Sequence, residues 1–151
     1  MRRDRIRPVF TKALIARKMN VPAATAWSAV TGIGRLDVWF PSIATCRVEG
    51  RGVGARRYLT GTAGGDIEDH IVAVEPDRRR LVYQRVRSPF PVSSYRGTVE
   101  VFESFDALAV VVWTIDFESA PADSGPVKSR LESAIGAGLE GMRADLEAAR
   151  A

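Results

Sequence analysis

Residues 108–119 have the sequence LAVVVWTIDFES, and residues 126–149 have the sequence PVKSRLESAIGAGLEGMRADLEAA. Successive side chains of a strand point to opposite faces. The bulky apolar residues of the first segment therefore share one face, and they are Val111, Trp113, Ile115 and Phe117. Apolar residues of the second segment recur at steps of three and four, which is typical of an amphipathic helix. We predict a strand over 108–119 that packs against a long helix over 126–149, with a polar linker over 120–125.

Upstream of this stretch, six further segments have the two-residue period of strands. They cover residues 11–21, 45–49, 54–62, 66–75, 80–87 and 93–104. Two short helices are predicted after the first of them, over 22–30 and 35–40, because Pro22 suits a first helical turn and Pro41 ends a helix. Strands that are segregated from helices in this order predict an α+β fold with an antiparallel sheet.

The length and composition fit one globular domain. The chain has 151 residues, of which 46% are hydrophobic and 26% are charged. We divide it into a basic N-terminal tail over 1–10 and a single ligand-binding domain over 11–151. The single cysteine, Cys46, excludes a disulfide within the chain and a cysteine cluster, and we expect no metal site and no cofactor.

Charge and hydropathy limit the partners and the location. The net charge is +4, but acidic residues are spread over the rest of the chain and no long basic face is evident, so we expect no nucleic-acid partner. No apolar run has the length of a secretory signal or of a membrane span, and we therefore expect a cytoplasmic protein without stable membrane insertion. The sequence leaves open whether the chain forms a homodimer.

Alternation also places polar groups on the inward face. Asp69, Tyr83 and Tyr95 fall on inferred inward faces, whereas His70, the only histidine, points the other way and is expected to be an ordinary surface residue. A buried Asp69 would be costly alone, and Arg57 on the neighbouring strand is its expected partner. Apolar walls with a few converging polar groups are typical of a small-molecule pocket, although the same residues could also form a plain core.

Several short segments occur in a characteristic order. They are Val38-Trp39-Phe40-Pro41, Gly52-Val53-Gly54-Ala55-Arg56-Arg57, Asp69-His70-Ile71-Val72-Ala73-Val74-Glu75-Pro76, Leu81-Val82-Tyr83 and Val92-Ser93-Ser94-Tyr95, followed by the strand at 111–117 and by Gly138-Leu139. Over residues 11–148 this series resembles the polyketide cyclase/dehydrase-like branch of the START/Bet v 1-like (SRPBCC) superfamily. The resemblance implies a helix-grip fold, in which a seven-stranded antiparallel sheet surrounds a C-terminal helix and two short helices follow the first strand. It also implies a deep apolar cavity, in which family members bind lipids, sterols, polyketides, plant hormones or aromatic intermediates; a minority catalyse cyclisation or dehydration.

The plant abscisic acid receptors of this superfamily provide a more detailed parallel. Their cavity-lining acidic and tyrosine residues match Asp69 and Tyr95, and their gate and latch loops match residues 62–65 and 88–92. Neither loop has the receptors' signature residues. The receptors' lysine that pairs with the ligand is missing, since its position corresponds to the region of Ala44 in this sequence. Hormone specificity is therefore not transferred to this chain.

We expect the domain to bind or transport a small hydrophobic molecule of lipid, polyketide or aromatic type in an internal cavity. The residues predicted to line it are Trp39, Arg57, Leu59, Ile67, Asp69, Ile71, Tyr83, Tyr95, Val99, Trp113, Ile115, Phe117, Ile135 and Leu139. The alternative is a polyketide cyclase/dehydrase-type enzyme of lyase type. Asp69, with a pKa raised by burial, would then be the base, and Tyr95 would polarise a carbonyl group.

Overall fold

The alternating segment at 108–119 forms a strand next to the edge of the sheet in the computed structural model, which describes residues 7–150. This strand, β7 (Leu108–Ser119), pairs antiparallel with β1 (Val9–Pro22) on one side and with β6 (Ser94–Glu103) on the other. Trp113 lies opposite Ile15 in β1 and opposite Val99 in β6. Residues 1–6 of the predicted basic tail lie outside the described residues, and β1 begins two residues before the predicted start at residue 11.

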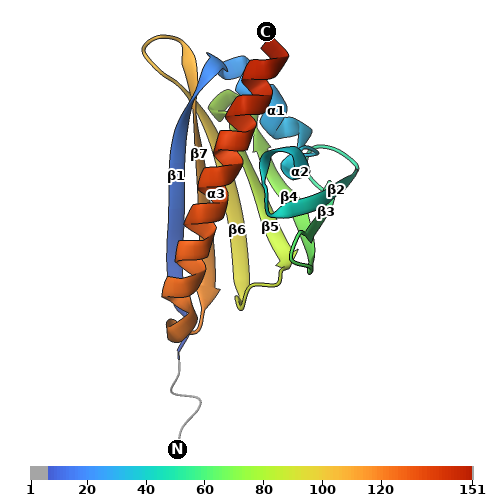
Figure 1. Ribbon diagram of the computed structural model, residues 1–151, viewed down its shortest axis with the longest axis vertical. Coiled ribbons are helices and arrows are strands. Elements are labelled where there is room, and N and C mark those ends of the chain that lie inside the picture. Colours follow the sequence, from blue (N-terminus) through green and yellow to red (C-terminus); the bar gives the residue numbers. More distant parts are fainter. Residues whose placement is uncertain (1–6, 151) are drawn as a thin grey trace, which may run out of the picture.

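Seven strands form one antiparallel sheet (Figure 1). The other four are β2 (Ile43–Glu49), β3 (Arg56–Gly61), β4 (Asp66–Glu75) and β5 (Arg80–Arg87). The strand order is β1-β7-β6-β5-β4-β3-β2, so that β1 and β2, which are separated only by two helices in the chain, lie at opposite edges. These helices are α1 (Ala23–Gly32) and α2 (Leu36–Trp39), and a short 3-10 turn η2 (Pro76–Arg78) joins β4 to β5. The predicted sheet and the two helices after the first strand are confirmed.

The C-terminal helix α3 (Pro121–Arg150) begins five residues before the predicted start, and the predicted linker is part of it. Two prolines misled the prediction. Pro121 stands at the first helical position, where a backbone N–H has no partner within the helix. Pro126 lies inside the helix, where it removes the bond that its N–H would make to the carbonyl of Ala122. The hydroxyl of Ser124 in the first turn of α3 bonds the hydroxyl of Thr11 in β1 at 2.9 Å.

The helix α3 lies along the concave face of the sheet on the side of β1 and β7 (Figure 1). Its apolar stripe is buried there and includes Leu131, Ile135, Leu139 and Met142. Two glycines let α2 and the residue after it approach the helix closely. A Cβ added at Gly141 would lie 2.0 Å from the carbonyl oxygen of Trp39, and one added at Gly138 would lie 2.4 Å from the ring of Phe40. Because α3 covers one side of the sheet, the inner face of the middle strands remains available for a cavity.

Candidate functional site

An open cavity of about 500 Å³ lies between the sheet and α3. Its walls come from the inner face of β4–β7, from α2 and the segment after it, from the loops at 61–64 and 89–90, and from one face of α3. The lining residues are Leu36, Phe40, Pro41, Ser42, Ile43, Gly61, Thr62, Ala63, Gly64, Ile67, Tyr83, Arg85, Pro89, Phe90, Tyr95, Trp113, Ser129, Arg130, Leu131, Ser133, Ala134, Ile135 and Ala137. Exposed residues of the two loops and of α3 mark its mouth, whereas the aromatic residues Tyr83, Tyr95 and Trp113 are buried.

Behind this aromatic wall, Asp69 is held between two arginines. In the sheet it lies directly opposite Arg57 of β3 and opposite Arg85 of β5. Arg85 donates from Nε to Oδ1 at 2.7 Å and from Nη2 to Oδ2 at 3.1 Å, and Arg57 donates from Nε to Oδ2 at 3.0 Å. All three side chains are almost fully shielded from solvent, with 0% of Asp69, 3% of Arg57 and 8% of Arg85 exposed. The predicted pairing of Asp69 with Arg57 is therefore present, and Arg85 is an additional partner.

This double pairing decides the ionisation of Asp69. Burial by itself raises the pKa of the carboxyl group, but the charges and hydrogen bonds of Arg85 and Arg57 outweigh it, and the pKa of Asp69 lies below its ordinary value. The predicted raised pKa is wrong, because the neighbours of Asp69 are cationic rather than apolar. Asp69 is an ionised anchor for the arginines and is poorly suited to act as a base.

The aromatic wall supplies neutral hydrogen-bond donors. The indole Nε1 of Trp113 donates to the hydroxyl of Tyr83 at 3.1 Å, and Nη1 of Arg85 donates to the hydroxyl of Tyr95 at 3.3 Å. Burial raises the pKa of both tyrosines, so their hydroxyl groups stay protonated at neutral pH. Tyr83 fits against the sheet because Gly97 on β6 has no side chain; a Cβ there would lie 2.1 Å from the tyrosine ring.

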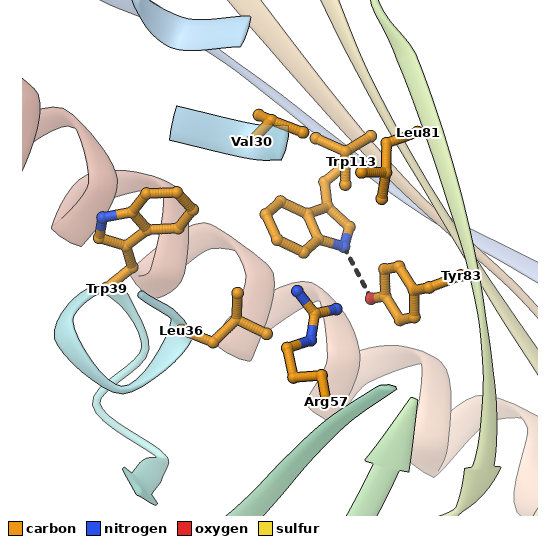
Figure 2. Close-up of a pocket in the computed structure, with 8 residues that line it drawn as sticks. Val30, Leu36, Trp39, Arg57, Leu81, Tyr83 and Trp113 are labelled. Atoms are coloured by element: carbon orange, nitrogen blue, oxygen red, sulfur yellow. Dashed lines mark hydrogen bonds between the residues drawn. The ribbon is translucent and has the colours of Figure 1, made fainter. Parts of the chain in front are cut away.

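A second, much smaller void of about 10 Å³ lies deeper in the molecule (Figure 2). Its lining residues are Val30, Leu36, Trp39, Arg57, Leu81, Tyr83, Val99 and Trp113. Figure 2 shows the guanidinium group of Arg57 pointing into this space, beside the Trp113–Tyr83 hydrogen bond. Nη2 of Arg57 is buried and has no hydrogen-bond partner, although it lies 3.0 Å from Oδ2 of Asp69 as an ion pair, because the angle is unfavourable. Trp39 is fixed at the edge of the void by its bond to Asp145 at 2.8 Å.

The structure separates the predicted lining residues into three groups. Those that line the large cavity are Ile67, Tyr83, Tyr95, Trp113 and Ile135. Those that line only the small void are Trp39, Arg57 and Val99. The others are buried but line neither space, and they are Leu59, Asp69, Ile71, Ile115, Phe117 and Leu139. The inward face is larger than the cavity, so a residue such as Ile115 or Phe117 can point inward and be part of the closed core.

Sequence reasoning missed several lining residues. Arg85 lies two residues after Tyr83 in β5, and this two-residue period was the available signal for including it. Phe40 lines the cavity and packs edge-on against Trp113, with ring centroids 5.2 Å apart. Among the helix residues that line the cavity, Ile135 alone was predicted, because periodicity defines the stripe toward the sheet but does not show which residues border a void, such as Ala134 and Arg130.

His70 lies on the opposite face of β4 from Asp69, where its Nε2 is 2.7 Å from Oε2 of Glu68, as expected for a residue outside the site. Over residues 7–150, no group of three or more His, Cys, Asp or Glu side chains is arranged to hold a metal ion. None of the described helices is both long and apolar enough to cross a membrane.

Comparisons with known proteins agree with this geometry. A family model described as polyketide cyclase/dehydrase and lipid transport matches residues 13–147. The structure of XoxI from Bacillus cereus has a TM-score of 0.81 at 19% identity and covers 93% of this chain and 99% of its own. A Thermobifida fusca protein gives a TM-score of 0.77 at 25% identity, with 89% and 92% covered.

A third similar structure is that of an enzyme. A point mutant of norcoclaurine synthase from Thalictrum flavum, solved with a transition-state analogue, has a TM-score of 0.80 at 14% identity, with 97% of this chain and 100% of its own covered. No curated protein matches the chain significantly in sequence.

Proposed function

We propose, since the chain belongs to the polyketide cyclase/dehydrase and lipid transport family, that its domain binds a small, largely hydrophobic molecule in the cavity beside α3. The observation that carries this proposal is the open space of about 500 Å³ between the sheet and the helix. Ligand sites commonly have volumes of roughly 300–1,000 Å³, apolar walls and a few polar groups that orient the guest. The cavity combines such walls with Arg85 and Tyr95 at its buried end. A cytoplasmic location and a transport role remain predictions from the sequence and the family.

Burial of the ligand's carbon would supply the affinity. A guest that loses roughly 300 Å² of apolar surface to the cavity walls gains roughly 7 kcal/mol, at about 25 cal/mol per Å². Part of that gain offsets the lost freedom of the guest. The walls are preformed, since Tyr83, Tyr95 and Trp113 are each at most 3% exposed and already hydrogen-bonded. Ordering of the protein therefore adds little to the cost.

Filling the cavity should abolish binding. Ala134 lines the cavity on α3, and Ala134→Phe would place a ring inside it. We expect the uncharged fluorophore N-phenyl-1-naphthylamine to bind the natural protein with enhanced emission and to bind the variant at least tenfold more weakly, about 1.4 kcal/mol. Ala144→Phe is the matched control, because Ala144 is an exposed residue of the same helix that is not among the lining residues.

Two outcomes would contradict the proposal. The first is a natural protein that leaves the fluorophore's emission unchanged at concentrations where it is folded. The second is equal affinity in Ala134→Phe and Ala144→Phe, which would locate the probe elsewhere. Native mass spectrometry of protein purified from cells provides an independent check, since a co-purifying hydrophobic molecule would be released unchanged from a carrier.

A cyclase- or dehydrase-type enzyme is the second candidate. The tyrosine hydroxyls and Arg85 form a group of donors that could stabilise negative charge developing on a substrate oxygen. Norcoclaurine synthase shows that an enzyme can have this fold. In this function Tyr95 would contact the substrate, whereas Asp69 would position Arg85. We expect Tyr95→Phe to slow turnover of a poly-β-ketone by 10-fold or more; turnover that is absent, or equal in the variant, would exclude this assignment.

A further inference from the structure

The buried end of the cavity has an excess of positive charge. Two guanidinium groups, Arg57 and Arg85, share the single carboxylate of Asp69, and the three side chains have almost no contact with solvent. Among the described residues that line the large cavity there is no Asp or Glu. A further cation, Arg130, lies at the mouth over the ring of Phe90, at 4.8 Å from its centroid. Charge therefore has the same sign at the entrance and at the buried end.

The two buried arginines also have unused donors. A guanidinium group has five N–H donors. Arg85 uses three of them, two toward Asp69 and one toward Tyr95. Nη2 of Arg57 is buried without a hydrogen-bond partner. Arg85 and Tyr95 both line the large cavity, so the unused donors of Arg85 and the protonated hydroxyl of Tyr95 are near any guest that reaches this end.

A buried net charge is unfavourable unless an opposite charge compensates it. Asp69 compensates one guanidinium group, and the lining residues offer no second anion. A carboxylate or another acidic oxygen of a guest would complete the pairing and would accept charge-assisted hydrogen bonds, which are stronger than bonds between neutral groups. A neutral guest of the same shape would leave the charge uncompensated.

We propose that the cavity selects hydrophobic molecules that carry an acidic group, whose negative charge lies against Arg85 and Tyr95 while the apolar body fills the space beside α3. This inference rests on the proposed binding function and specifies the chemical class of its ligand. Arg130 contributes by attracting anions to the mouth, an effect that salt screens more strongly than the contact with Arg85 because Arg130 is exposed.

A pair of matched probes tests the inference by isothermal titration calorimetry of the purified natural chain at pH 7.5. The probes are 2-naphthylacetate and 2-naphthylacetamide, which share one apolar body and differ in charge. We expect the acid to bind at least about tenfold more tightly than the amide. In Arg85→Gln this preference should fall to about twofold, whereas Arg85→Lys, which keeps the charge, should retain most of it. Arg96→Gln is the matched control, since Arg96 is an exposed arginine next to Tyr95 and should leave the preference intact.

Each outcome has one meaning. An amide that binds as tightly as the acid to the natural protein overturns the charge preference and leaves the proposed binding function standing. Failure of both naphthyl probes while N-phenyl-1-naphthylamine binds also overturns the charge preference alone. Failure of all three probes overturns the proposed function and this inference with it. If Arg85→Gln does not fold, as judged by the absence of a cooperative melting transition, the natural protein and Arg85→Lys still decide the result.

Discussion

Asp69 has no exposed side-chain surface, and both of its oxygens accept hydrogen bonds from arginine. Its position between Arg57 and Arg85 follows from strand register, since it pairs with one arginine on each neighbouring strand. The first pairing could be predicted, because β3 and β4 are joined by a short turn. The second could not, because β-bulges shift the register between β4 and β5 on both sides of this pair. Alternation alone does not reveal a bulge.

Removing the charge of Asp69 should destabilise the fold strongly. Asp69→Asn would leave two buried guanidinium groups without a counter-ion, and breaking a buried pair in this way costs about 3–5 kcal/mol in the free energy of unfolding. Urea denaturation at pH 7 measures the loss. Asp66→Asn is the control, because Asp66 is exposed on the same strand and should change stability by less than about 0.5 kcal/mol.

The same pairing predicts the direction of the pH dependence. The pKa of Asp69 in the folded chain lies below its unfolded value of about 3.9. Its contribution to stability is therefore fully present above about pH 4 and is lost as the pH falls through the folded pKa. The melting temperature of the natural protein should fall more steeply on acidification than that of Asp69→Asn. Parallel curves would show that folding does not lower the pKa of Asp69.

At the scale of elements, the contact between α2 and α3 depends on glycine. Gly141 and Gly138 let the backbone at Trp39 and the ring of Phe40 lie directly against the helix. The bond from Trp39 to Asp145 then fixes α2 at one position along α3. Phe40 in turn contacts Trp113, so that this glycine contact positions part of the cavity wall.

A methyl group at Gly141 should disrupt this contact. Gly141→Ala would place its Cβ 2.0 Å from a backbone oxygen, which cannot move aside as a flexible side chain could. We expect a loss of about 1–3 kcal/mol in the free energy of unfolding, as for other overpacked cores. The control is Gly136→Ala, also in α3, where the nearest atom is the end of Arg17 at 3.6 Å. It should gain up to about 1 kcal/mol from better helix propensity, and a similar gain in Gly141→Ala would refute the prediction.

Most helices and strands could be predicted from the hydrophobic period of each segment and from the glycines and prolines that separate the segments. Every strand of the sheet was placed to within a few residues, because glycine and proline mark the turns and the two-residue period persists between them. The largest error concerns the start of α3. There Pro121 indicated a linker and Pro126 the start of the helix, yet the first helical position tolerates proline because its N–H has no partner within the helix. A proline therefore does not distinguish a linker from the start of a helix.

At the scale of the whole molecule, the inward face was predictable but the cavity boundary was not. Ile115 and Phe117 alternate with Trp113 in the same way, yet only Trp113 borders the open space. Which inward residues remain uncovered depends on where α3 crosses the sheet, and packing between distant elements decides that position. The contacts of Gly138 and Gly141 with Phe40 and Trp39 help to set the position of α3, and the hydrophobic period of a single segment does not predict such contacts.

The pairing of β1 with β7 has a consequence for how the protein is made. Among the strands of residues 7–150, β1 is synthesised first, but its partner strand β7 is the last, and α3 follows β7. During translation, the backbone of β1, with Phe10 and Leu14, therefore has no partner strand until most of the domain has been synthesised. Long-range pairings of this kind fold slowly and leave strand edges open to aggregation. The edge of β1 therefore stays without its partner strand until β7 has been translated.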